Sequence, residues 1–391
     1  MEKARILMKR DTCFLVRMEL KMKEIVEKKN FFTKTDTLLL KGVAIIMMMY
    51  HHCFLNKARF EGHEINPTPF TMEMLIQTSN FCKLCVAIFV FLSAYGMTIS
   101  LKKINTNMDL SANEFTLYTK KRFFNLMQGW LFVFIFCQIF SFLINKYQIE
   151  RYGSDVAKAI IYFLLDGLGI ADLFETPMLT DTWWYMSYAI VIIIVFPLLI
   201  LLYKKIGSMG MLLFVAILPR IISIHYEPFE NWFLVIIFGI IFADNNLLVR
   251  MKEKKFTKNI IWDKVIKLLL CFLLLHLGVF LRESCDLGFF FEFRHGLLSL
   301  LVIYVIYEFL PDMKYLNTML IFTGKHSMNM FLTHTFIRYV YLNEFTYSFR
   351  YPIVIVAVLF SLSLVLSILI EQMKKWIGYN RLVENLRKRW F

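Results

Sequence analysis

The sequence predicts an all-α polytopic membrane protein with about ten transmembrane helices, and three observations support this prediction. The first is composition, since 58% of the 391 residues are hydrophobic and the mean hydropathy is +0.57, whereas soluble domains are nearer half apolar. The second is that several apolar runs reach the ~20 residues that a helix needs to cross a bilayer. The third is that charged residues, only 19% of the chain, cluster between those runs. We therefore expect one membrane domain to fill almost the whole chain, with the lipid bilayer around it.

Ten apolar runs are the candidate spans. They lie at roughly 36–55, 81–101, 127–146, 183–203, 209–224, 231–248, 265–281, 296–311, 318–341 and 351–371. This division predicts three parts: a basic N-terminal arm at 1–35, a membrane domain at 36–371 and a basic tail at 372–391.

The distribution of lysine and arginine predicts the orientation, because cytoplasmic loops are enriched in both residues. The N-terminal arm is basic throughout, so we expect it in the cytoplasm. With ten spans, the basic loops at 102–122, 204–205 and 250–264 also fall inside, and so does the C-terminal tail. Both termini are therefore predicted to be cytoplasmic.

An eleventh apolar run, 156–171, is short and contains Lys158, Asp166 and two glycines. Counting it as a span would move two of the basic loops to the outside, against the charge rule. We therefore expect a re-entrant or interfacial segment near the outer surface. The tryptophans that follow, Trp183 and Trp184, are then expected at the outer membrane interface.

Two ionisable residues of the first span, Lys41 and His52, share one helix face. They are eleven residues apart, which is three turns plus about 20° and about 16 Å along the axis. Lys41 falls near the inner end and His52 near the outer end. A neutral imidazole titrates near working pH and can take a proton from a hydroxyl. We therefore predict His52 as a general base and Lys41 as a cationic anchor, both catalytic, whereas His51 is rotated by about 80–100° and points elsewhere.

Each of these two residues also has a simpler interpretation. Lys41 is explained equally well as a lysine whose amine reaches the inner membrane surface. His52 is explained as an interfacial histidine in contact with water or lipid headgroups.

Four more residues are predicted to support the site. Ser93 and Tyr95 lie in the stretch FVFLSAYGM, where small residues permit close helix approach. Asn329 and His334 lie in TGKHSMNMFLTHTFI, an apolar run with an unusual density of polar groups. A serine in a span is more often a packing or backbone-bonding group than a nucleophile, and a lone histidine is usually a satisfied core residue.

The loop before the third span contains three adjacent cations, Lys120, Lys121 and Arg122. Ordinary inside charge accounts for them. They also suit the phosphates of a cytoplasmic donor, because arginine can make bidentate contacts with phosphate. At the outer mouth, Arg282, Arg294 and His295 suit an anionic acceptor, although solvated loop charge explains each of them alone.

Several classes of function are disfavoured. The net charge of +14 would suggest nucleic-acid binding in a soluble protein, but here membrane topology explains it, so we expect no nucleic-acid partner. There is no Gly-x-x-x-x-Gly-Lys phosphate loop and no Cys/His set at metal-binding spacing, so neither an ATP-driven pump nor a metal site is predicted. A transporter or flippase for a lipid-linked sugar or small anion stays open, because the same lysine and histidine would line its path.

The motifs together resemble the acyltransferase-3 family, integral membrane O-acyltransferases of bacterial envelopes, over about residues 36–371. The basic residue, ten-residue gap and histidine of the family fall on Lys41 and His52, with lysine where arginine is usual. FVFLSAYGM is similar to an aromatic-rich family stretch, with Ala94 in place of glycine. KKRFFN is similar to an R-x-x-R element, with Arg122 retained and Asn125 in place of the second arginine. GKHSMNMFLTHTFI is similar to a late family span, with His334 at its histidine.

The resemblance implies transfer of an acyl group, commonly acetyl, from cytoplasmic acyl-CoA to a hydroxyl of an extracytoplasmic or lipid-linked polysaccharide. Acyl-CoA would be a substrate, and no bound cofactor is implied. The expected partners are acyl-CoA, a glycan or lipid-linked glycan acceptor and the bilayer. The implied location is the bacterial plasma membrane, as a multi-pass protein.

Overall fold

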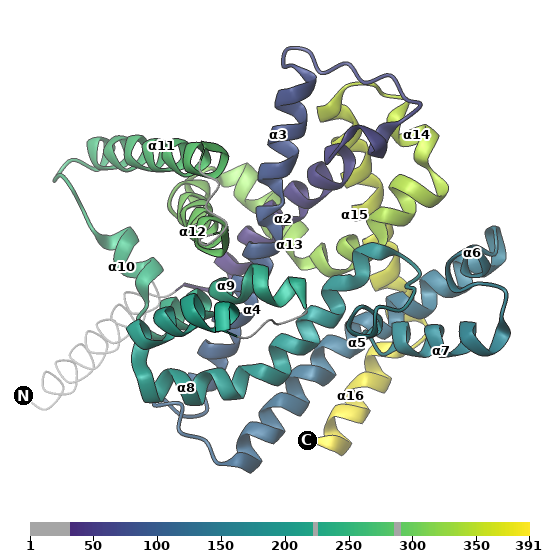
Figure 1. Cartoon of the computed structure of the whole chain (residues 1–391), viewed down its shortest axis with the longest axis horizontal. Helices are drawn as coiled ribbons and strands as arrows, with labels where there is room; N and C mark the ends of the chain where they lie inside the picture. The colour runs from purple at the N-terminus through teal and green to yellow at the C-terminus, as the bar shows by residue number, and fades with distance from the viewer. Residues whose placement is uncertain (1–31, 222–225, 285–290) are drawn as a thin grey trace, which may run out of the picture.

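The computed structural model describes residues 32–221, 226–284 and 291–391 (Figure 1). Within these ranges the chain forms helices and connecting turns, with no strand, as the sequence predicts. Most of the predicted N-terminal arm, residues 1–31, lies outside the described residues. The side chains of Arg282, Arg294 and His295, predicted at the outer mouth, also lie outside them.

The helices follow one another along the chain with short connections. The longer ones are α2 (Lys34–Phe54), α3 (Met72–Cys82), α4 (Leu84–Lys102), α5 (Ala112–Ile144), α8 (Trp184–Ile221), α9 (Glu227–Asp244), α11 (Ile260–Ser284), α12 (Phe291–Phe309), α13 (Lys314–Thr335) and α15 (Pro352–Trp376). The shorter ones are α6 (Tyr147–Tyr152), α7 (Val156–Gly167), α10 (Leu247–Glu253), α14 (Asn343–Tyr347) and α16 (Tyr379–Trp390). Single turns are η1 (Lys57–Phe60), η2 (Ala171–Phe174), η3 (Asp181–Trp183), η5 (Leu310–Asp312) and the π-helix η6 (Phe336–Tyr341).

Five segments of the described chain are long and apolar enough to cross a membrane. They are Lys34–Phe54, Met72–Lys102, Ala112–Ile144, Asp181–Leu218 and Pro352–Trp376. A sixth is possible if the pair Asn231–Asp244 and Leu247–Glu253, bent by 65°, forms one broken span. The runs predicted at 183–203 and 209–224 form one element, α8, interrupted where Gly207 adopts φ 69° and ψ −176°. The ten spans and the orientation of the termini stay predictions.

The segment predicted to be re-entrant or interfacial forms the short helix α7, followed by η2. At 12 residues, α7 is about 18 Å long, well short of the ~30 Å hydrocarbon core. Apart from Lys158, its exposed side chains are apolar, and Val156 is 72% exposed and Leu164 56%. Its buried end is held by Asp166, whose carboxylate accepts hydrogen bonds from Tyr152 Oη at 2.7 Å and the Leu179 amide at 2.8 Å.

Helices α2 and α13 cross near the centre of the molecule (Figure 1), and two glycines allow their backbones to touch. A Cβ on Gly42 would lie 2.8 Å from the carbonyl carbon of Leu320, and one on Gly324 would lie 2.7 Å from that of Leu38. Only glycine fits at such a reciprocal contact, as in other small-residue crossings between membrane helices. The crossing holds the C-terminal parts of α2 and α13 side by side, where the rings of His52 and His334 are 5.0 Å apart.

Local capping decides where α2 and α5 begin. Thr33 and Asp36 form a capping box, in which the Asp36 amide donates to Thr33 Oγ1 at 3.2 Å and the Thr33 amide donates to Asp36 Oδ2 at 2.8 Å. Ser111 and Glu114 form the equivalent box at the start of α5. Because each box satisfies amides that the first helical turn leaves unpaired, it sets the register of the helix that follows.

Candidate active site

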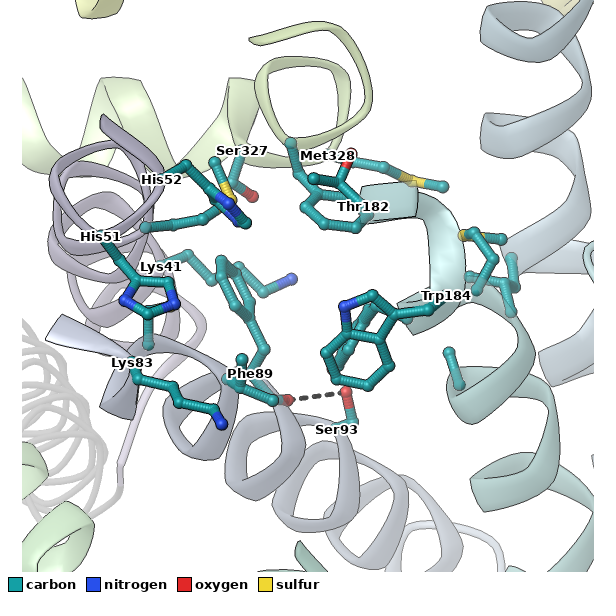
Figure 2. A pocket seen from close by; sticks show the side chains of 18 residues that line it. Lys41, His51, His52, Lys83, Phe89, Ser93, Thr182, Trp184, Ser327 and Met328 are labelled. Atoms are coloured by element: carbon teal, nitrogen blue, oxygen red, sulfur yellow. Dashed lines mark hydrogen bonds between the residues drawn. The ribbon is translucent and has the colours of Figure 1, made fainter. Parts of the chain in front are cut away.

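A cavity of about 250 Å³ lies among α2, α4, α8 and α13 (Figure 2). The predicted pair Lys41 and His52 both line it, as do Ser93 and Thr182. Because the two α2 residues are about 16 Å apart along the helix axis, the cavity is elongated along α2. It therefore connects the two groups that the sequence predicts to act together.

The cavity is cationic. Lys41 extends its amine into it (Figure 2), and Lys83, at the junction of α3 and α4, lines it as well. None of the described residues that line the cavity is acidic. Lys83 is a site residue that the sequence argument missed, although a lysine near the start of an apolar run is a signal that could have revealed it.

His52 stands out among the cavity residues because its Nδ1 atom is buried and has no hydrogen-bond partner among the described residues. Its ring centre lies 5.0 Å from that of His334 and 5.4 Å from that of His51. Buried polar atoms are almost always bonded, so each exception requires an explanation. This unpartnered nitrogen belongs to a side chain that lines the cavity, so His52 is a candidate for contact with a bound molecule.

His51 does not point away from the site as predicted. It also lines the cavity, and its Nδ1 donates to the Ser79 carbonyl oxygen at 2.8 Å. The prediction was wrong because it compared directions at the helix axis. The cavity is wide enough to be reached by two adjacent side chains about 100° apart. The hydrogen bond to α3 still distinguishes His51 from His52, since it occupies one of the two ring nitrogens.

His334 contacts the ring of His52 from α13 without itself lining the cavity. Its Nδ1 lies 2.7 Å from the Phe331 carbonyl oxygen, so Nδ1 has the hydrogen and Nε2 is left as an acceptor. Nε2 is 3.3 Å from the hydroxyl of Thr335. That hydroxyl is in turn 3.1 Å from the hydroxyl of Thr182, a cavity residue. The two threonines thus link the second histidine to the cavity.

The other three predicted supporting residues have different surroundings. Ser93 lines the cavity, but its hydroxyl donates to the Phe89 carbonyl oxygen at 2.8 Å (Figure 2), which is the backbone-bonding role described above. Tyr95 is 3% exposed and packs on Phe32 with ring centres 4.9 Å apart, in the core rather than on the cavity wall. Asn329 donates to Glu371 of α15 at 2.9 Å and so ties α13 to α15.

The three cations predicted on the inner side, Lys120, Lys121 and Arg122, also have different surroundings. Lys120 and Lys121 are exposed. The guanidinium of Arg122 turns back onto α4, where it donates to Ser100 and, at 3.3 Å, to the Gly96 carbonyl oxygen. Gly96 is one turn from Ser93, so Arg122 lies beside the helical turn that reaches the cavity.

A fourth cation near this part of α5 comes from the C-terminal tail. Arg387 of α16 donates to Asn125 Oδ1 at 2.8 Å and approaches Gln128 Oε1 at 3.3 Å. Its guanidinium therefore lies where the R-x-x-R element would have its second arginine. Arg387 could not be predicted from the sequence, because no local pattern connects residues 262 positions apart.

Two arginines that were also missed lie near His52 without lining the cavity. Arg338, in η6, is 1% exposed, donates to Tyr347 Oη at 3.3 Å and has a buried Nε without a described partner. Arg59, in η1, lies within electrostatic range of Arg338. Burial lowers the pKa of Arg59, and the positive charge of Arg338 lowers it further. The π-helix η6 begins two residues after His334. Such helices often occur at functional sites, and no pattern in the sequence predicts this one.

The two tryptophans expected at the outer interface differ in burial. Trp183 is 1% exposed, packs edge-on against Trp130 at 4.7 Å and donates its indole N–H to the Leu332 carbonyl oxygen at 3.0 Å. Trp184 lines the cavity. Trp183 ends η3 and Trp184 begins α8, directly after Thr182, which contacts α13. The burial of Trp183 contradicts its interfacial assignment, whereas that of the half-buried Trp184 stays a prediction.

The fold and the cavity define a polytopic helical membrane protein with a buried cationic site suited to acid–base chemistry. Comparison with protein families gives one match, to the acyltransferase-3 model described as an acyltransferase domain, over residues 39–372. The chain therefore belongs to the acyltransferase-3 family and is a membrane acyltransferase. Comparison with curated proteins and with solved structures found no match.

Proposed function

We propose that this protein transfers an acyl group, most simply acetyl, from cytoplasmic acyl-CoA to a hydroxyl of an extracytoplasmic or lipid-linked polysaccharide. The observation that favours this activity is that a single cavity contains Lys41 and His52, and that His52 has a buried nitrogen without a partner. The charge distribution favours an orientation in which these two residues lie toward opposite membrane faces. A donor from one side and an acceptor from the other could then meet in the cavity.

The size of the cavity favours a short acyl group. Its volume of about 250 Å³ equals roughly eight waters at about 30 Å³ each. That is less than the ~300–1,000 Å³ of a site that encloses a drug-sized ligand. It can hold an acetyl thioester and the reacting part of a sugar, whereas the nucleotide of the donor must stay outside, near the inner cations.

The proposed reaction needs one base and one site for negative charge. The acceptor oxygen attacks the thioester carbonyl carbon, the carbon–sulfur bond breaks, and His52 takes the hydroxyl proton. The proton then passes to the thiolate sulfur, so no net proton is gained or lost. Lys41 and Lys83 give the cavity a positive potential that stabilises the negative charge of the tetrahedral intermediate and of the thiolate.

The proposed location is the bacterial plasma membrane, with both termini in the cytoplasm. The basic loops and tail favour this orientation. In this proposed orientation, Lys120, Lys121 and Arg387 would face the side where acyl-CoA is available.

The test is transfer of a radiolabelled acetyl group from acetyl-CoA by the purified protein, together with acetylation of polysaccharide in cells that express it. His52→Ala at normal protein levels should abolish both, and His51→Ala should be milder. His276→Ala, on the exposed face of α11, is the matched control and should be neutral. Acetylation retained by His52→Ala would refute the assignment of the base. Substrate movement across vesicles without any acyl transfer would favour a transporter instead.

A further inference from the structure

Helix α16 is fixed against the inner half of α5 by contacts along one α5 face. Tyr379 donates to the Gln128 carbonyl oxygen at 2.7 Å, and its ring packs on Phe132 at 4.9 Å. At the other end, the ring of Phe124 lies 6.0 Å from Trp390 and 5.6 Å from Phe391. Contacts at both ends give α16 a defined position, so its side chains can belong to a site on α5.

Arg387 occupies the middle of this contact with spare hydrogen-bonding capacity. A guanidinium has five N–H donors, and the two contacts of Arg387 use one nitrogen, Nη2, toward neutral amide oxygens. No carboxylate among the described residues pairs with it. The nearby carboxylate of Glu384 is already bonded to Lys388 at 2.9 Å. Arg387 is thus oriented by Asn125 and Gln128, and its charge is not neutralised by a described residue.

The surroundings of Arg387 suit an anion with several oxygens. Lys121 extends over the ring of Phe391, with its Nζ 5.7 Å from the ring centre, on the same side of α5 as α16. Leu126, between Asn125 and Gln128 in the same turn, lines the cavity. Arg387 is therefore level with the cavity wall along the axis of α5 but on a neighbouring face, since Leu126 is rotated by about 100° from Asn125, and Lys121 lies on the face of Arg387. A donor whose acyl arm enters the cavity would have to pass around α5 to place its phosphates beside these two cations.

We propose that Arg387 and Lys121 bind the phosphates of the acyl-CoA donor, so that the C-terminal helix completes the donor site. The inference rests on the proposed acyl transfer. Arginine suits this role because its planar fork makes paired hydrogen bonds with phosphate oxygens. It compensates for Asn125, which stands at the position of the second arginine in the R-x-x-R element and here orients an arginine from the tail.

The experiment compares two donors on protein reconstituted in phosphatidylcholine vesicles. Arg387→Ala should raise the KM for acetyl-CoA about tenfold, as expected for loss of a charge-assisted contact, with kcat and the acceptor KM unchanged. With S-acetylpantetheine, which lacks the phosphates, Arg387→Ala and wild type should be equally active. Arg381→Ala, an exposed arginine of the same helix, is the control and should behave as wild type.

Three outcomes would overturn the inference. An unchanged KM for acetyl-CoA means that Arg387 does not contact the donor. An equal loss with both donors means that Arg387 only holds α16 in place. A loss that appears only in vesicles with added phosphatidylglycerol means that Arg387 binds lipid phosphate. A wild-type protein that uses neither donor would instead refute the proposed function, so the two failures are distinguishable.

Discussion

Replacing Gly324 by alanine should separate α2 from α13 and reduce activity far more than one added methyl group would suggest. The new Cβ would lie 2.7 Å from the carbonyl carbon of Leu38, where ordinary contact begins at 3.4 Å. The obstructing atoms belong to the backbone, which cannot rotate away as a side chain can. The helices must therefore part by at least about 0.7 Å, the difference between these two distances.

The energetic cost should lie near the upper end of the ~1–3 kcal/mol found when a packed core is overfilled. That corresponds to a melting temperature lower by roughly 4 °C for a chain of this size. The effect on catalysis is larger, because His52 is on α2 and His334 is on α13, with ring centres 5.0 Å apart. A displacement approaching 1 Å of catalytic groups can cost about 100-fold in rate.

The assay is thermal unfolding in detergent together with acetyl transfer. Gly42→Ala, the reciprocal glycine, should behave like Gly324→Ala, and the double variant should lose less than the sum, because one separation accommodates both methyl groups. Gly96→Ala is the matched control, since nothing lies within 4 Å of its added Cβ. If Gly324→Ala had the melting temperature and rate of wild type, the close crossing would not hold the histidines in place.

Three further predictions concern single side chains. Burial raises the pKa of Asp166 from 3.8 to about 6, so the folded protein favours the protonated carboxyl and loses up to about 3 kcal/mol of stability as the pH rises from 4 through 6. Asp166→Asn should remove this loss, so its melting temperature should be higher than that of wild type at pH 8 and the same at pH 4. Thr335→Val removes the hydroxyl 3.3 Å from His334 Nε2 and should lower kcat about tenfold. Thr335→Ser keeps the hydroxyl and should keep the wild-type kcat, and so should Thr333→Val, which removes a hydroxyl bonded only to backbone. Equal rates for Thr335→Val and Thr335→Ser would exclude a role for the Thr335 hydroxyl. Arg122→Lys keeps the charge but loses the contacts to Ser100 and Gly96, so it should lower thermal stability by about 1–2 kcal/mol, and an unchanged melting temperature would contradict the bridging role.

The sequence alone was sufficient for the helical class and for the pairing of Lys41 with His52. Both follow from short-range regularities: the length of an apolar run that can cross a bilayer and the 100° rotation per residue of a helix. The family resemblance then added the type of reaction, of which the family comparison confirmed acyl transfer in general. The same periodicity was misleading for His51, because a helix projection contains no information about how wide the neighbouring cavity is.

The remaining parts of the site were decided by tertiary structure. Thr182 meets Thr335 across 153 positions, and Arg387 meets Asn125 across 262. No periodicity within one helix can bring such residues together, since their meeting depends on how helices cross and where the chain turns. The crossing itself depends on Gly42 and Gly324. Their role could not be predicted from the sequence, because it depends on which backbone lies opposite each glycine. The sequence determined which chemical groups are available, and the packing of α2, α13 and α16 decided which of them can act together.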